Sequence, residues 1–413
     1  MTERSRKLQY LGLALVLLIA VLLDLYAGST LRYKDETDYE QVARSMLHQH
    51  EFSDADGNLT MDRPPGYPAA IALAYSIAET PLAVRFENTI VLLLAVVALG
   101  SLARRLTPRS EAFVPYLVLA YPLVLYASMV LYPQVLGCLL LSIVTLLVMQ
   151  DELRTRDVAL AGLCYGFLIL AIPYFALLLP LVSLCILLRD GSIKRLHFKP
   201  AIVLFVVSVL VISPWTIRNY VNFHVLVPVS ANNGKNLFIG NSPITTPTSG
   251  RTADVMPLCK AVHDGMTEYD FDTAMRNCAI DWIRHNPADA ARLYLGKVIG
   301  YFNYRNDIAT PGESAVWRDW VVFATYYPLL LICLIRLALA GRYPLRRAEI
   351  FIYVLYFSNA FASAIFFPRL RFRIPFDFML IAVNAAFLTR WWASRAVRGL
   401  SGGASTVSAA RSA

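Results

Sequence analysis

Three carboxylates stand close together just after the first long apolar run of the chain. Asp35 and Glu36 are adjacent, and Asp38 follows three positions after Asp35. A carboxylate in such a place can take the proton of a hydroxyl group as that hydroxyl attacks a carbon atom. The same residues also suit a helix start, where Asp caps the first turn and acids interact favourably with the helix dipole. For Asp38, which precedes the short amphipathic segment 40–47, a base and a helix cap are both open.

Basic residues at the ends of apolar runs form a second group of candidate functional residues. A phosphate leaving group in a poorly hydrated site needs a cation, and Arg or Lys supplies it. The candidates are Arg63, Arg218, Lys235, Arg369, Arg371 and Arg373. Arginines at span ends also extend to lipid headgroups, which is the structural alternative. Three arginines within 369–373 favour a functional role for Arg371 and Arg373, because the preference for cytoplasmic positive charge does not explain them on the outer side.

The composition shows which kind of scaffold must hold these side chains. The chain has 413 residues, of which 57% are hydrophobic and 16% are charged, and its mean hydropathy is +0.51. Soluble domains contain about 25% charged residues and cannot bury this much apolar surface. The apolar residues also come in runs of roughly 20, the length of a helix that crosses a bilayer. The sequence therefore excludes an ordinary soluble enzyme and predicts an all-α, multispanning membrane protein.

We expect about ten transmembrane helices. Their ranges are 8–28, 84–104, 112–130, 133–150, 157–172, 173–189, 200–217, 317–336, 348–366 and 374–392. The first run follows a basic start, as in a signal peptide, but it is too long for one and further spans follow. The apolar segment 66–80 is short and follows two prolines, so we interpret it as an interfacial or re-entrant helix.

The distribution of Lys and Arg predicts the orientation of these spans. Basic residues are concentrated in the short loops on the side of the N-terminus, which places both termini in the cytoplasm. The net charge of +9 is therefore a signal of topology. A nucleic-acid-binding patch is not supported, because the charges are scattered over several short loops. Two long loops, 29–83 and 218–316, then lie on the outer side, where we expect the functional site.

The chain is expected to form one integral membrane domain over residues 1–392. The remaining tail, 393–413, is rich in Ser, Gly and Ala and is expected to be cytoplasmic and disordered. Cys259 and Cys278 both fall in the second outer loop, where an outward compartment permits a disulfide, and a disulfide and two free thiols are equally supported. Cys and His spacings typical of a zinc site are absent from the sequence, so no metal site is predicted.

Strings along most of the chain resemble one family of membrane enzymes. The Asp-Glu pair is followed by Arg-Pro-Pro-Gly-Tyr-Pro at 63–68, and a later span closes with Pro-Trp-Thr-Ile-Arg-Asn-Tyr at 214–220. Asn-Asn-Gly-Lys-Asn at 232–236 and Arg-Leu-Arg-Phe-Arg-Ile-Pro at 369–375 follow in order. Together they resemble the GT-C glycosyltransferases, in the branch of the protein O-mannosyltransferases and the lipid A aminoarabinose transferase. The resemblance covers most of the chain, from residue 8 to residue 392.

This resemblance implies a GT-C fold and an inverting transfer of a sugar from a polyprenyl phosphate to an acceptor hydroxyl. Asp35 occupies the position of the family's catalytic Asp and is the expected base, with Glu36 as the nearest substitute. The donor phosphate is expected to bind among Arg63, Arg218, Lys235, Arg371 and Arg373. No cofactor is required and a divalent metal is compatible with the scheme. The acceptor is a lipid, glycan or protein, and no nucleic acid takes part.

The resemblance also implies a location, which is a bacterial inner membrane with the site on its outer face. One departure concerns an acid that relatives often carry in the fourth span, because this chain has Tyr132-Pro133-Gln134 there and that acid's role is not transferred. The main alternative function is a lipid-linked-sugar flippase or transporter, and the second is a scaffold of GT-C architecture. Transporters usually show internal repeats and charged helices at mid-membrane, neither of which is evident here.

Overall fold

The computed structural model describes residues 3–191, 196–252, 254–305 and 316–409, and within them the chain forms sixteen α-helices. The helices are α1 Glu3–Ala27, α2 Lys34–His48, α3 Gly66–Tyr75, α4 Pro81–Leu106, α5 Val114–Leu119, α6 Pro122–Ser128, α7 Gln134–Val148, α8 Thr155–Ala171, α9 Leu179–Leu187, α10 Phe198–Phe223, α11 Asn233–Gly240, α12 Glu268–His285, α13 Pro287–Gly300, α14 Val316–Ala338, α15 Arg347–Ile365 and α16 Leu370–Ala409. Short 3-10 helices are η1 Ser110–Ala112, η2 Pro173–Leu178, η3 Gly250–Thr252, η4 Met256–Leu258 and η5 Leu339–Gly341.

Six of these helices are long and apolar enough to cross a membrane, namely α1, α4, α10, α14, α15 and α16. A seventh candidate is the pair Ser110–Leu119 and Pro122–Ser128, which is bent by 73°. A helix therefore lies in each of the ten ranges expected from the sequence, but the count of ten full spans is not confirmed.

Prolines account for the shorter helices. Pro122, Pro133 and Pro173 each stand at the beginning of a helix, where the missing N–H costs nothing, and each ends the run before it. The result is that α7 has only 15 residues and α8 only 17. At 1.5 Å per residue these helices are about 22 to 26 Å long, which is less than the roughly 30 Å of a hydrocarbon core.

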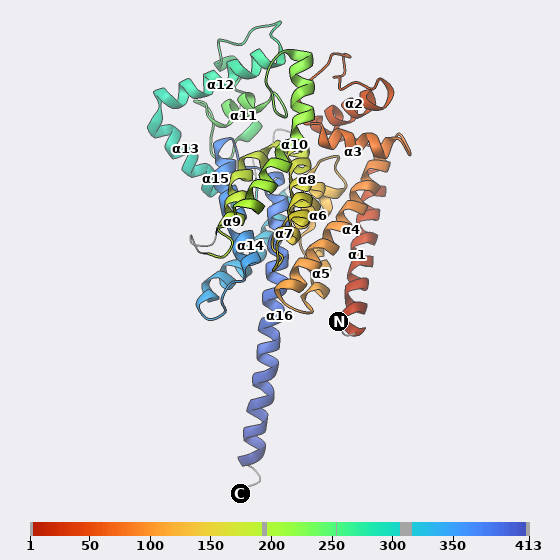
Figure 1. Cartoon of the computed structure of the whole chain (residues 1–413), viewed down its shortest axis with the longest axis vertical. Coiled ribbons are helices and arrows are strands. Elements are labelled where there is room, and N and C mark those ends of the chain that lie inside the picture. The colour runs from red at the N-terminus through yellow and green to blue at the C-terminus, as the bar shows by residue number, and fades with distance from the viewer. Residues whose placement is uncertain (1–2, 192–195, 253, 306–315, 410–413) are drawn as a thin grey trace.

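Helices of the two long outer loops gather at one end of the molecule. Figure 1 shows α2 and α3 of the first loop and α11, α12 and α13 of the second at the end that lies away from both termini. Glu268, at the start of α12, joins the two loops. Its carboxylate accepts hydrogen bonds from Thr60 Oγ1 at 2.5 Å and from the Met61 N–H at 2.7 Å. The two loops therefore form one structure above the helices.

The segment expected to be interfacial or re-entrant forms the ten-residue helix α3. Its first residue, Gly66, lies directly against the end of α8. A Cβ at this position would be 2.6 Å from the Ala171 nitrogen, which is too close for any side chain. Glycine thus allows the end of the first outer loop, including Pro64, to lie beside the end of α8.

Helix α16 forms the centre of the apolar core. Residues 376–386 are all buried, and they pack against α4, α7, α14 and α15. This burial agrees with an apolar run that has neighbours on every side. The first residues of α16 reach the end of the molecule where the outer loops gather (Figure 1). A side chain at the start of α16 is thereby positioned by the whole core.

The tail differs from the expectation of disorder over 393–413. Helix α16 continues to Ala409, and 410–413 lie outside the described residues. Extending a helix by one residue costs much less than starting one, so Ala, Arg and Ser residues can continue a helix that the core has already nucleated.

Two features hold the second outer loop together. Cys259 and Cys278 form the disulfide that the sequence permitted, and it joins the segment after η4 to the middle of α12. Cross-linking a loop of this size removes freedom from the unfolded chain.

Lys297 of α13 is the second feature, and it is fully buried. Its Nζ donates hydrogen bonds to Gly240 O at 2.9 Å, to Asn241 Oδ1 at 3.1 Å and to Phe366 O at 2.9 Å. It therefore connects α13 to the end of α11 and to the turn before α16. Burial lowers the pKa of Lys297 to about 7.

Replacing Lys297 with Met should remove a pH-dependent part of the protein's stability. The unfolded chain keeps this proton up to the ordinary pKa of 10.5, whereas the folded chain releases it near pH 7. Between these values the unfolded state binds more protons, so the free energy of unfolding rises with pH. We expect the Tm of the purified wild type to rise relative to that of Lys297→Met from about pH 7 to about pH 9.

Lys260→Met is the matched control, because Lys260 is an exposed lysine of the same loop. Its melting curves should follow those of the wild type. Parallel pH dependence in the wild type and Lys297→Met would contradict this assignment.

Candidate active site

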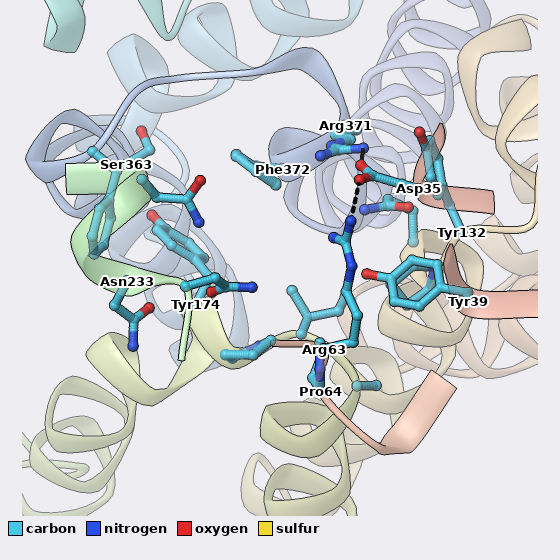
Figure 2. A pocket seen from close by; sticks show the side chains of 18 of the residues that line it. Asp35, Tyr39, Arg63, Pro64, Tyr132, Tyr174, Asn233, Ser363, Arg371 and Phe372 are labelled. Atoms are coloured by element: carbon cyan, nitrogen blue, oxygen red, sulfur yellow. Dashed lines mark hydrogen bonds and ion pairs between the residues drawn. The ribbon is translucent and has the colours of Figure 1, made fainter. Parts of the chain in front are cut away.

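Asp35 lies between two arginines that come from distant parts of the chain. Its Oδ1 accepts a hydrogen bond from Arg63 Nη2 at 3.0 Å, and its Oδ2 accepts one from Arg371 Nη1 at 2.7 Å. Arg63 lies in the first outer loop, between α2 and α3, and Arg371 is the second residue of α16. Figure 2 shows the three side chains meeting on one wall of a cavity. Arg63 also pairs with Asp38, one turn further along α2.

The start of α2 is held by Glu36, which is completely buried. Its Oε2 accepts hydrogen bonds from the backbone N–H groups of Arg32 at 2.7 Å and Tyr33 at 2.9 Å. Its Oε1 accepts one from the Leu131 N–H at 2.9 Å. The carboxylate therefore satisfies donors at a helix start and ties α2 to the segment before α7. This position differs from the role of substitute base expected for Glu36, because both of its oxygens are occupied by backbone groups.

Aromatic rings cover both arginines. The guanidinium of Arg371 lies 4.9 Å from the centre of the Tyr132 ring, and that of Arg63 lies 5.5 Å from the centre of the Tyr39 ring. Burial opposes the charged form of Arg63, but the carboxylate of Asp35 and the other nearby groups raise its pKa above the ordinary value. Arg63 is therefore a permanent cation, and the rings lower its exposure to water.

The cavity beside Asp35 has two chemically different ends. It encloses about 140 Å³. Its lining residues are Asp35, Tyr39, Arg63, Pro64, Tyr132, Pro133, Gln134, Ala171, Ile172, Pro173, Tyr174, Asn232, Asn233, Asn236, Ser363, Phe366, Phe367, Arg371 and Phe372. Figure 2 shows the ionic group on one side and Tyr174, Asn233 and Ser363 on the other. We call this space the first cavity.

A second cavity adjoins the first at Arg63 and Asn232, which line both. It encloses about 370 Å³ between the two outer loops. Its other lining residues are Lys34, Asp38, Asp62, Lys235, Ile239, Thr252, Asp254, Val255, Met256 and Met275. Asp35 and Asp38 of one helix thus line different cavities, with the Arg63 side chain between them.

The other cations expected to bind phosphate have different positions. Lys235 lines the second cavity, and Arg369 lies over the Phe367 ring. Arg218 donates hydrogen bonds to the Thr60 and Phe52 carbonyls and lies near three aromatic rings, so it fastens the first outer loop to α10.

Arg373 is buried in the helices rather than at a cavity wall. It pairs with Asp377 at 2.8 Å and donates to the Tyr301 carbonyl at 2.6 Å. Among the described lining residues of both cavities, neither Arg218 nor Arg373 occurs, which corrects the expected set of phosphate-binding residues. Their guanidinium groups are used by carbonyls and a carboxylate that hold helices and loops together.

Several lining residues were not predicted as site residues from the sequence. Tyr39 and Tyr174 line the first cavity, yet each is a single aromatic residue near an apolar run, which an interfacial belt or packing usually explains. Tyr132 and Gln134 also line it, and their signal was the departure at 132–134, where relatives often carry an acid. In the part of the chain that the structure describes, no group of three or more His, Cys, Asp or Glu residues is arranged to hold a metal ion.

Comparison with known proteins bears on the fold. No family model matches the chain, and no curated protein matches it either. The archaeal oligosaccharyltransferase AglB from Archaeoglobus fulgidus, solved with an inhibitory peptide and a dolichol-phosphate, is similar with a TM-score of 0.56 and 12% identity. This match covers 97% of the present chain and 52% of the AglB chain, so the chain spans about half the length of AglB. The present chain has the GT-C fold.

Two structures of ArnT from Cupriavidus metallidurans are also similar. The one bound to undecaprenyl phosphate has a TM-score of 0.43, and the apo structure has one of 0.42. Each match has 16% identity and covers 91% of the present chain and 77% of ArnT. The predicted all-α, multispanning GT-C fold is confirmed by the AglB match, which at this identity concerns the fold alone.

Replacing Glu36 with Gln should destabilise the protein, because an amide presents its NH2 group to backbone N–H donors. A buried donor left without its acceptor costs about 1 to 3 kcal/mol. We therefore expect a lower Tm for Glu36→Gln in detergent, measured by the thermal unfolding of purified protein. Glu152→Gln, which changes an exposed glutamate, is the matched control. A Tm equal to that of the wild type would show that Glu36 does not hold α2.

Proposed function

We propose that this protein is a glycosyltransferase that moves a sugar from a polyprenyl-phosphate carrier to an acceptor hydroxyl. The observation that carries the proposal is the carboxylate of Asp35 at a cavity wall, bound by Arg63 and Arg371. A carboxylate and two fixed cations are the groups that deprotonation of a hydroxyl and departure of a phosphate require. The GT-C fold shared with AglB, whose structure holds a dolichol-phosphate, supports this choice.

The reaction is a single displacement. The acceptor oxygen forms a bond to the anomeric carbon while the bond from that carbon to the phosphate oxygen breaks, so the configuration inverts. The proton of the acceptor hydroxyl passes to Asp35, and the polyprenyl phosphate leaves with the bonding electron pair. Arg63 and Arg371 stabilise its negative charge. These fixed cations take the leaving charge, so the scheme requires no divalent metal and remains compatible with one.

Substrate binding must change the contacts of Asp35. Both of its oxygens are bound to guanidinium groups in the free protein, where they are poor proton acceptors. The phosphodiester of the donor carries one negative charge, as the carboxylate does, and its two non-bridging oxygens accept hydrogen bonds from the same arginines, so it competes with the carboxylate. When the arginines bind the phosphate, an oxygen of Asp35 becomes available to the acceptor hydroxyl.

The two cavities offer separate places to the two substrates. In this proposal the donor occupies the first cavity, and the acceptor enters through the second, past Asp38 and Lys235. Asp38, which also pairs with Arg63, then helps to orient the arginine rather than capping α2. In this proposal the active site faces the outer side of a bacterial inner membrane, and both termini lie in the cytoplasm. The position of its loops, away from both termini, supports this orientation.

Replacing Asp35 with Asn should abolish transfer, because an amide cannot accept the proton. We expect turnover to fall by at least about 10²-fold, the usual contribution of a general base. The measurement is transfer of label from radiolabelled polyprenyl-phosphate sugars to lipid, glycan or protein, using membranes that contain wild type or variant and supply the acceptor. Asp56→Asn, an exposed aspartate of the same loop, is the matched control and should retain wild-type turnover.

A folded Asp35→Asn protein is recognised by a monodisperse elution profile and by a rise in Tm on adding undecaprenyl phosphate. Wild-type turnover in that protein would overturn the proposal. If no labelled sugar is transferred by the wild type, but labelled carrier lipid crosses vesicle membranes that contain it, the flippase alternative would replace the transferase.

A further inference from the structure

Gln134 carries a buried polar atom whose partner is missing. It is the first residue of α7 and lines the first cavity together with Asp35, Arg63 and Arg371. The residue is 4% exposed, and its Oε1 makes no hydrogen bond. A buried acceptor without a donor costs about 1 to 3 kcal/mol, and such groups in native proteins require an explanation. A ligand that donates a hydrogen bond at this position would remove that cost.

The phosphate of the donor cannot be this ligand group. Phosphate oxygens are hydrogen-bond acceptors, and in the proposed function they bind Arg63 and Arg371. An amide oxygen needs an O–H or N–H donor instead. On a sugar phosphate such donors are the hydroxyl groups, or an ammonium group if the sugar carries one.

The charge of the cavity distinguishes between these two. Among its described lining residues, Asp35 is the only acid, and in the proposed reaction its released oxygen serves the acceptor hydroxyl. An ammonium group would therefore lie near two guanidinium cations without a carboxylate of its own, which is costly in a poorly hydrated site. A neutral sugar meets no such penalty.

The opposite wall of the cavity suits a neutral sugar. Asn233 and Asn236 bring amide groups to it, which can both donate to and accept from hydroxyls. Tyr174 and Phe372 are stacked with their ring centres 6.1 Å apart and their planes within 9°, and they add an apolar surface for the C–H face of a sugar ring. An apolar wall that carries a few polar groups is typical of sites that fix the orientation of a small ligand.

We propose that the transferred sugar is neutral and that Gln134 Oε1 accepts a hydrogen bond from one of its hydroxyls. This inference rests on the proposed function and names the sugar class of the same site. Gln134 then positions the sugar relative to Asp35, and it selects against donors that lack that hydroxyl, because the amide would remain unpaired.

The sugar class is tested with membranes that contain the full-length protein and supply the acceptor, and with four donors, which are undecaprenyl phosphates carrying mannose, glucose, galactose or 4-amino-4-deoxyarabinose. We expect label transfer from at least one neutral sugar, with kcat/KM for the amino sugar at least about tenfold lower. Transfer that favours the amino sugar would overturn the inference and leave the proposed function in place. Transfer from none of the four would count against the proposed function and against the inference with it.

The role of Gln134 is tested by Gln134→Leu, with Gln150→Leu as the matched control just past the other end of α7. We expect kcat/KM for the neutral donor to fall by about tenfold in Gln134→Leu, as for the loss of one hydrogen bond, mostly through KM. Gln150→Leu should behave as the wild type.

A series of monodeoxy analogues of that donor separates binding from structure. With the wild type, one analogue should have a kcat/KM about tenfold below that of the parent donor. With Gln134→Leu, the same analogue and the parent donor should have equal kcat/KM, because both changes remove the same hydrogen bond. If Gln134→Leu lowers kcat/KM by the same factor for the parent donor and for every analogue, Gln134 does not bind the sugar. The same conclusion follows if the substitution changes only the Tm of the protein.

Discussion

The arrangement of the site depends on one ionic contact, the carboxylate of Asp35 between the guanidinium groups of Arg63 and Arg371. A poorly exposed carboxylate needs cations and hydrogen-bond donors around it, or burying it costs several kcal/mol. The two arginines meet this need from the first outer loop, between α2 and α3, and from the start of α16. The contact therefore ties the loop that forms the cavity wall to the helix at the centre of the core.

A contact of this kind suits a site whose ligand is an anion. A buried ion pair adds little net stability, because the cost of desolvation offsets most of its attraction. Exchanging a carboxylate for a phosphate on the same guanidinium groups is consequently possible without unfolding the loop. The neighbouring Glu36 shows the contrast, since its oxygens are bound by the backbone N–H groups of Arg32, Tyr33 and Leu131. Adjacent acids thus differ in role because their partners differ.

The loops above the helices are built to keep these groups in place. Glu268 holds the first loop to α12, and Arg218 fastens it to α10. Lys297 joins the second loop to the turn that leads into α16. All three are charged side chains that bind main-chain atoms at the outer end of the molecule. These three residues fix the walls of the two cavities, whereas the residues that line the cavities carry polar groups that a substrate can bind.

The sequence by itself determined the membrane class and the two long loops, and it predicted Asp35 as a candidate base, because apolar length, turn residues and clustered charge are local properties. Tertiary structure decided which cation meets that carboxylate. Arg371 and Arg373 are two positions apart and so point about 200° apart around a helix. As a result, Arg371 contacts Asp35 while Arg373 pairs with Asp377 in the core. The unpaired Oε1 of Gln134 also depends on how distant segments pack, which no local pattern records.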